Sequence, residues 1–194
     1  MLFPFSFMQA QEFTYDVDAA AFFARVTAAG GSLSNTEKIA TNQLVLDLKA
    51  NSLWTPMKAI YPMVGSSAAA CAQNLKSASF TGNFSSGWTF ASTGATPNGT
   101  SAFMNTGFFP SANLSVNSVH ASLYLNTNNV AITSDPVDLG AFQGILQALT
   151  IVQSSSVSLA VNTRNLGSSI ATTQTTRVGF YHFFKNKRNV NYIV

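Results

Sequence analysis

The chain has 194 residues, of which 46% are hydrophobic and only 9% charged, and its formal net charge is +3. This length suits one domain, or one domain with a small appendage, and the hydrophobic content excludes a disordered chain. The single cysteine excludes an intramolecular disulfide, and no apolar run approaches the roughly 18 residues of a membrane-spanning helix.

The first eight residues are apolar but short, lack a basic segment and are interrupted by Pro4. These features favour an extended arm that packs on this chain or a neighbour over a signal peptide. A helix is predicted to follow, because Asp16 and Asp18 suit the positive end of a helix dipole and Gly30 and Gly31 suit its end. Its apolar positions at helical spacing are Val17, Ala20, Ala21, Ala24 and Ala28.

A second helix is predicted to open with Ser34 and Glu37, which have the spacing of a capping box. In that motif the serine side chain caps the helix and the glutamate reaches back to the serine backbone. The apolar positions are Ile39, Leu44, Leu46 and Leu48, and the helix is expected to end near Asn51. One more short helical turn is predicted from the spacing of Trp54, Met57, Ile60 and Tyr61.

Charge divides the sequence in two, because residues 77–134 contain no Asp, Glu, Lys or Arg. We therefore predict an N-terminal arm and helical segment over residues 1–70 and a β-domain over residues 71–194. Many short strands separated by Gly, Asn and Pro turns favour a sandwich or jelly roll. Strands are predicted at 79–84, 88–90, 102–104, 121–125 and 156–161, and a strand is favoured over a helix for 139–149.

Four segments resemble a helix-to-domain junction and the following strands of bacteriophage and prophage virion proteins: residues 46–65, 74–76, 87–103 and 113–124. The resemblance covers residues 42–126. It implies the front half of a concanavalin-like, laminin-G-like jelly-roll β-sandwich in a tail-fibre-like or other virion component. After residue 126 it fades, and a late strand near 177–187 is followed closely by Val194. We therefore expect a sandwich that is shortened or diverged at its C-terminal end, and two alternatives stay open: the sandwich is complete by itself, or a neighbouring chain completes its last edge.

The predicted sandwich contains few side chains that are suited to catalysis or metal binding. It contains no Glu, and its only acids, Asp135 and Asp138, flank Pro136, where caps of a turn are more plausible than the paired carboxylates of a glycosidase. Calcium binding by these two acids stays open. The histidines, His120 and His182, are expected to pack like aromatic residues. We predict a protein that is not an enzyme and has no cofactor or resident metal.

The charge-free half has two interpretations. Permanent protein interfaces are depleted of charge, which favours a virion protein that assembles with other virion proteins and with copies of itself. Alternatively, aromatic rings and amide side chains bind host-surface glycans. The contact residues for either role are expected to be Trp88, Tyr124, Asn126, Asn128 and Asn129. Neither nucleic acid nor membrane insertion is expected, because the one basic cluster, Lys185, Lys187 and Arg188, is better explained as a solvated tail.

Overall fold

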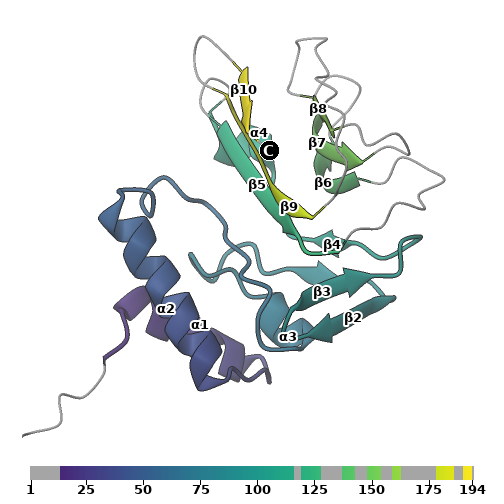
Figure 1. The fold of residues 1–194 in the computed structure, drawn as a ribbon. Coiled ribbons are helices and arrows are strands. Elements are labelled where there is room, and N and C mark those ends of the chain that lie inside the picture. The colour runs from purple at the N-terminus through teal and green to yellow at the C-terminus, as the bar shows by residue number, and fades with distance from the viewer. Residues whose placement is uncertain are drawn as a thin grey trace, which may run out of the picture. The chain divides into compact units, whose positions relative to one another are not determined.

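The computed structural model describes residues 14–115, 119–127, 137–142, 148–153, 159–162, 178–185 and 190–193. They form two compact units that divide between Gly107 and Phe108 (Figure 1). The predicted N-terminal arm lies outside the described residues. The fold combines helices with small antiparallel sheets, so the expected succession of helices and then strands is confirmed at this coarse level.

The first unit contains three helices and two strand pairs. The helices are α1 (Val17–Ala28), α2 (Asn35–Ala50) and α3 (Ala68–Cys71). The strands are β1 (Asn83–Phe84), β2 (Trp88–Ala91), β3 (Gly94–Pro97) and β4 (Met104–Asn105). β1 pairs with β4 and β2 with β3, both antiparallel. The extra helical turn predicted after α2 is wrong: residues 54–56 form a turn and 57–64 have no regular structure, since Pro56 and Pro62 bracket this segment.

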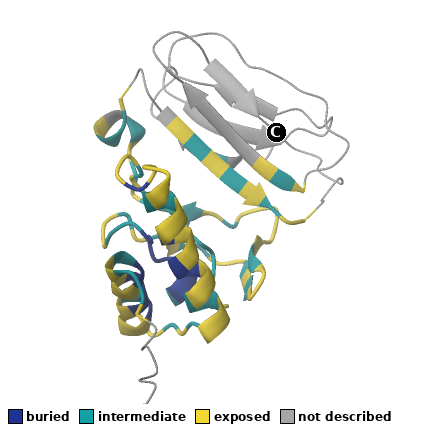
Figure 2. Cartoon of the chain, turned by 60° about the vertical axis from the view of Figure 1, so that its left-hand side comes forward, coloured by how far each residue is buried: buried dark blue, intermediate teal, exposed yellow. Residues whose placement is uncertain are grey.

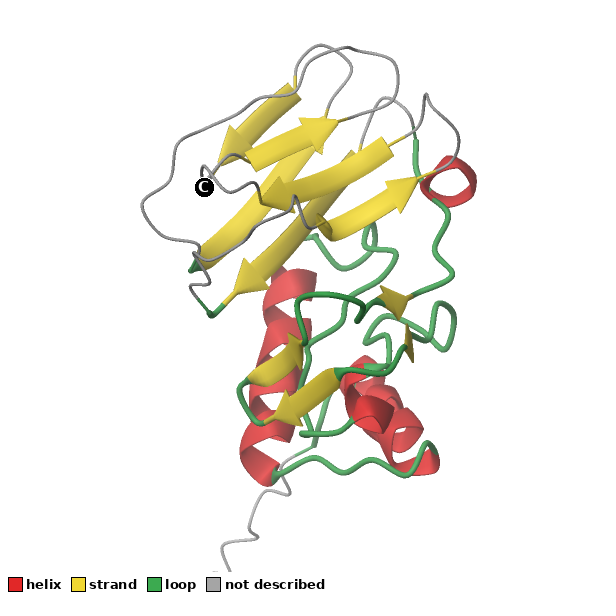
Figure 3. Ribbon diagram, turned by 90° about the vertical axis from the view of Figure 1, so that its right-hand side faces the viewer, coloured by secondary structure: helices red, strands yellow, loops and turns green. Residues whose placement is uncertain are grey.

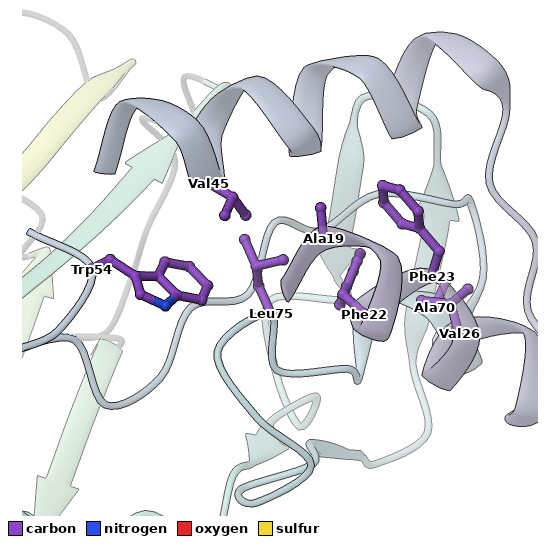
Figure 4. Close-up of a cluster of buried hydrophobic side chains, with 8 residues drawn as sticks. All are labelled: Ala19, Phe22, Phe23, Val26, Val45, Trp54, Ala70 and Leu75. Carbon is purple, nitrogen blue, oxygen red and sulfur yellow. The ribbon is translucent and has the colours of Figure 1, made fainter. Parts of the chain in front are cut away.

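The core of the first unit lies between α1, α2 and the chain after α3. Phe22, Val26, Val45 and Leu75 are fully buried there, and Figure 4 shows their side chains with those of Ala19, Phe23, Trp54 and Ala70. Leu75 therefore belongs to the same core as the helices. This core belongs to the compact unit that ends at Gly107, whereas the division of the chain near residue 70 stays a prediction.

The buried face of α1 is not the alanine face marked by the sequence. Ala19, Phe22, Phe23 and Val26 are buried, whereas Val17 and the alanines at 20, 21, 24 and 28 are exposed. The reason is size, because burying two phenylalanine rings removes far more apolar area from water than burying alanine methyl groups. The edge-to-face contact of Tyr15 with Phe23, 5.0 Å between ring centroids, adds to this face.

Both predicted helix starts are confirmed in detail. Asp16 caps α1 by accepting a hydrogen bond from the Asp18 backbone N–H. At α2, Ser34 Oγ accepts from the Glu37 N–H, and Glu37 Oε2 accepts from the Ser34 N–H at 2.8 Å. Glu37 also accepts from the Gly65 N–H at 2.8 Å, so the capping box ties the loop before α3 to the start of α2.

Glu37→Gln is expected to lower the free energy of unfolding by about 1 kcal/mol at pH 7. It is also expected to weaken the dependence of that free energy on pH in the acid range. Burial opposes ionisation of Glu37, but hydrogen bonds from Ser34 and Gly65 outweigh it and hold the pKa of the carboxyl below its ordinary value. A depressed pKa stabilises the folded chain above the unfolded pKa, and this stability is lost as pH falls through the folded value. Urea titrations of the wild type and of Glu37→Gln at pH 7 and pH 3 measure this loss. If the difference in unfolding free energy between the two proteins is the same at both pH values, Glu37 does not have the depressed pKa assigned to it.

In its described residues, the second unit contains one short helix and six strands. These are α4 (Pro110–Asn113), β5 (Val119–Leu125), β6 (Val137–Phe142), β7 (Ala148–Gln153), β8 (Leu159–Asn162), β9 (Gly179–Lys185) and β10 (Val190–Ile193). Two antiparallel three-stranded sheets result, in the orders β10-β9-β5 and β6-β7-β8 (Figure 3). The strand predictions near 121–125 and 139–149 are confirmed for their described residues, since β5, β6 and β7 occupy them.

Candidate functional site

The strand β5 presents a polar and aromatic face to solvent. His120, Ser122 and Tyr124 are exposed, and the residues between them, Ala121 and Leu123, are half-buried. Figure 2 shows this alternation along the strand. It follows from the two-residue period of a β-strand, in which successive side chains point to opposite faces.

The neighbouring strand β9 adds a second aromatic ring to the same face. Phe180 lies directly opposite Tyr124 in the antiparallel register, and the two ring centroids are 5.0 Å apart with a tilt of 44°. Tyr124 is 54% and Phe180 64% exposed, so the pair stands largely in water. We call His120, Ser122, Tyr124 and Phe180 the outer sheet face.

The register pairs Ser122 of β5 with His182 of β9, and His120 with Phe184. Asn126 follows β5 two residues after Tyr124, is exposed, and accepts a hydrogen bond from the Thr127 hydroxyl at 3.1 Å.

Trp88, the other predicted contact residue, belongs to a small aromatic cluster in the first unit. Its ring lies 5.1 Å from Phe84 in an edge-to-face contact and 6.4 Å from Phe90 in a near-parallel one. Its indole Nε1–H donates to the backbone oxygen of Phe103 at 3.3 Å. These contacts leave Trp88 half-buried and give it a packing role in this strand region, whereas its role in binding stays a prediction.

The structure does not gather the predicted contact residues into one site. Trp88 belongs to the first unit, while Tyr124 and Asn126 belong to the second. Asn128 and Asn129 lie outside the described residues. Phe180 was missed by the sequence reasoning, because only strand pairing reveals that a residue near the end of the chain adjoins Tyr124. The sequence predicted a late strand near residues 177–187 but not its neighbour.

The described residues bring together no set of metal-ligating or reactive side chains. No cluster of three or more His, Cys, Asp or Glu side chains occurs among them that could hold a metal ion. Cys71 is buried in α3, and this burial raises the pKa of its thiol, which disfavours the reactive thiolate. Asp138 is part of β6, and Asp135 lies outside the described residues.

None of the helices that the structure describes is both long and apolar enough to cross a membrane. Comparison with families of known proteins, with curated proteins and with solved structures found no match for this chain. Among the described residues, the outer sheet face is the candidate functional surface.

Proposed function

We propose that the chain is a non-enzymatic structural protein of a bacteriophage virion, which acts by packing against other virion proteins and copies of itself. The observation that carries the proposal is the outer sheet face, where Tyr124 and Phe180 stand largely exposed without a charged side chain between them. Aromatic enrichment and charge depletion are the compositional signature of protein interfaces.

The surface of the first unit supports the same proposal. Phe103, at the end of the loop before β4, is 61% exposed, and residues 77–134 as a whole carry no Asp, Glu, Lys or Arg. Exposed apolar surface with so little charge makes an isolated protein poorly soluble, whereas in an assembly the same surface is covered.

The finer fold belongs to this proposal. Two three-stranded antiparallel sheets in the second unit are components suited to a two-sheet sandwich. The finer assignment to a concanavalin-like jelly roll rests on the resemblance over residues 42–126, most of which fall in the first unit, where the strands form two pairs.

The double variant Tyr124→Ser/Phe180→Ser is expected to convert an oligomeric wild-type chain largely to monomer, with at least a tenfold weaker self-association. Removing two adjacent exposed rings takes away an aromatic contact while leaving the folded unit intact. Size-exclusion chromatography with light scattering measures the change. The matched control is Phe109→Ser, because Phe109 is an equally exposed aromatic residue of the same unit outside the outer sheet face.

Two outcomes would contradict the assembly proposal. One is a wild-type chain that is a stable, soluble monomer without affinity for phage particles. The other is an oligomer that the double variant and the Phe109→Ser control weaken equally, which would place the contact elsewhere than on the outer sheet face.

A second function, glycan binding, is favoured by one observation. The Tyr124–Phe180 pair has polar neighbours, Ser122, His120 and Asn126, so that aromatic stacking and hydrogen bonding to a sugar coincide. This function predicts that Tyr124→Ala abolishes binding on a glycan array and reduces adsorption to host cells without changing the oligomeric state. An array without hits for the wild-type chain would exclude it.

A further inference from the structure

Three backbone N–H groups converge on the side-chain oxygen of Asn98, in the loop after β3. Oδ1 of Asn98 accepts hydrogen bonds from the N–H groups of Thr100, Ser101 and Ala102, each at 3.0 Å. An amide oxygen has two lone pairs, so three donors exceed what it needs. Convergent backbone N–H groups of this kind are typical of sites that hold a negatively charged oxygen.

Gly99 follows Asn98, and this is the one place in the chain where glycine follows asparagine. Because glycine has no Cβ, its backbone nitrogen approaches the preceding side chain with the least steric hindrance. Gly99 has a φ of +76°, and nothing lies within 4 Å of the position that a Cβ would take. Within the part of the chain that the structure describes, the Gly99 N–H donates no hydrogen bond. Its nitrogen is therefore accessible and close in sequence to the Asn98 amide.

We propose that Asn98 is a site of spontaneous deamidation in the folded protein, and that the three N–H groups hold the carboxylate that results. After base removes the proton of the Gly99 nitrogen, this nitrogen attacks Cγ of Asn98, and the electron pair of the C=O bond moves onto Oδ1. The Cγ–Nδ2 bond then breaks, and the nitrogen takes up a proton and leaves as ammonia. A cyclic succinimide remains, which water opens to an aspartate or an isoaspartate. The net change is the uptake of one water molecule and the release of one ammonia molecule.

The groups around Asn98 act on the charges that this reaction develops. Oδ1 becomes an oxyanion during the attack, and donors already directed at it bind the charged oxygen more strongly than the neutral one. Nδ2 donates to the Ser101 hydroxyl oxygen at 3.0 Å, so this hydroxyl is placed to pass a proton to the departing nitrogen. Residues 97–101 are exposed, which gives water access to the succinimide.

The product fits the place of the amide. A carboxylate that accepts two or three backbone N–H bonds has a pKa well below its ordinary range and stays ionised at neutral pH. Residues 77–134 contain no Asp, Glu, Lys or Arg. Deamidation of Asn98 therefore adds a negative charge to a stretch that is uncharged in its sequence.

Mass spectrometry of the aged full chain tests the proposal directly. The protein is kept in a mildly alkaline buffer and digested with chymotrypsin, whose cleavage after Phe90, Phe103 and Phe108 gives the peptides 91–103 and 104–108. Each contains one asparagine, Asn98 and Asn105 respectively. Replacement of the amide by a carboxyl group is expected at least about ten times faster in peptide 91–103.

Asn105 is the matched control for this comparison. It is also exposed, and its Oδ1 accepts from the Gly107 N–H at 2.9 Å, but Thr106 follows it and a single N–H is directed at its oxygen among the described residues. Gly99→Ala is expected to slow deamidation of Asn98 at least about tenfold, because the methyl group hinders the approach of the nitrogen. Circular dichroism verifies that this variant is folded.

Two further measurements separate the contribution of the fold from that of the local sequence. The native chain is expected to deamidate at Asn98 at least as fast as the chain unfolded in guanidinium chloride, because only the folded loop directs three donors at Oδ1. Asn98→Asp is expected to keep the wild-type midpoint of urea unfolding at pH 7, whereas Asn98→Ala lowers it, because the alanine leaves the three N–H groups without their acceptor.

Three results would overturn the proposal. The first is equal modification of the peptides that contain Asn98 and Asn105. The second is slower deamidation in the native than in the unfolded chain, which would show that the hydrogen bonds hold the amide away from the Gly99 nitrogen. The third is an unfolding midpoint of Asn98→Asp as low as that of Asn98→Ala, since the loop would then not hold a carboxylate.

Discussion

Asn74→Ala is expected to lower the free energy of unfolding by about 3–5 kcal/mol, the largest effect of any single truncation of a polar side chain in the first unit. Asn74 is completely buried. Its Oδ1 accepts from the backbone N–H groups of Ile60 at 2.9 Å and Lys76 at 3.0 Å, and its Nδ2 donates to the Ser79 oxygen at 2.9 Å. Truncation leaves these part-buried backbone groups without their side-chain partner, and each such loss costs up to about 1–3 kcal/mol.

Chemical denaturation followed by far-ultraviolet circular dichroism measures the loss, since the long helices of the chain lie in the first unit. The matched control is Gln73→Ala. Gln73 is also buried, but its side-chain amide makes one hydrogen bond, to the Ala69 oxygen at 3.1 Å. If both substitutions cost the same, the assignment of Asn74 as the residue that holds residues 58–79 together would be wrong.

Gly65→Ala is expected to cost about 3 kcal/mol and to loosen the loop between α2 and α3. Gly65 has a φ of +86°, and an added Cβ would lie 2.5 Å from the Ala70 Cβ and 2.7 Å from the Ser32 carbonyl oxygen. A left-handed alanine costs roughly 1–2 kcal/mol, and overpacking adds about 1–3 kcal/mol. The same shift would strain the hydrogen bond from the Gly65 N–H to Glu37.

Gly99→Ala separates the two contributions to this cost. Gly99 also has a positive φ, +76°, but nothing lies within 4 Å of the position of its Cβ. Its substitution is therefore expected to cost only the conformational part, about 1–2 kcal/mol. Thermal or urea unfolding of both variants gives the comparison, and an equal loss at the two positions would remove the close approach as the reason for glycine at position 65.

Asn74 binds the chain before α3 to the chain after it, and the Arg25 guanidinium donates to the Asn74 backbone oxygen at 2.9 Å. These contacts attach the uncharged residues after Lys76 to the helical core.

Local sequence determined the helices and their starts. The cap of Asp16 and the capping box of Ser34 and Glu37 involve residues two or three positions apart, so their hydrogen bonds follow from the order of residues alone. The same holds for the strand period of β5, because alternation is a property of each strand by itself.

Tertiary structure decided which faces are buried and which residues meet. The apolar pattern of α2 did not reveal that Ile39 and Leu46 face outward, because the core is defined by α1 and by Leu75, far away in sequence. Likewise, the pairing of Tyr124 with Phe180 depends on the register of strands separated by more than fifty residues. The composition predicted an uncharged surface suited to contact with a partner. Long-range packing and strand pairing determine where the aromatic rings of that surface lie, since these contacts depend on the whole chain.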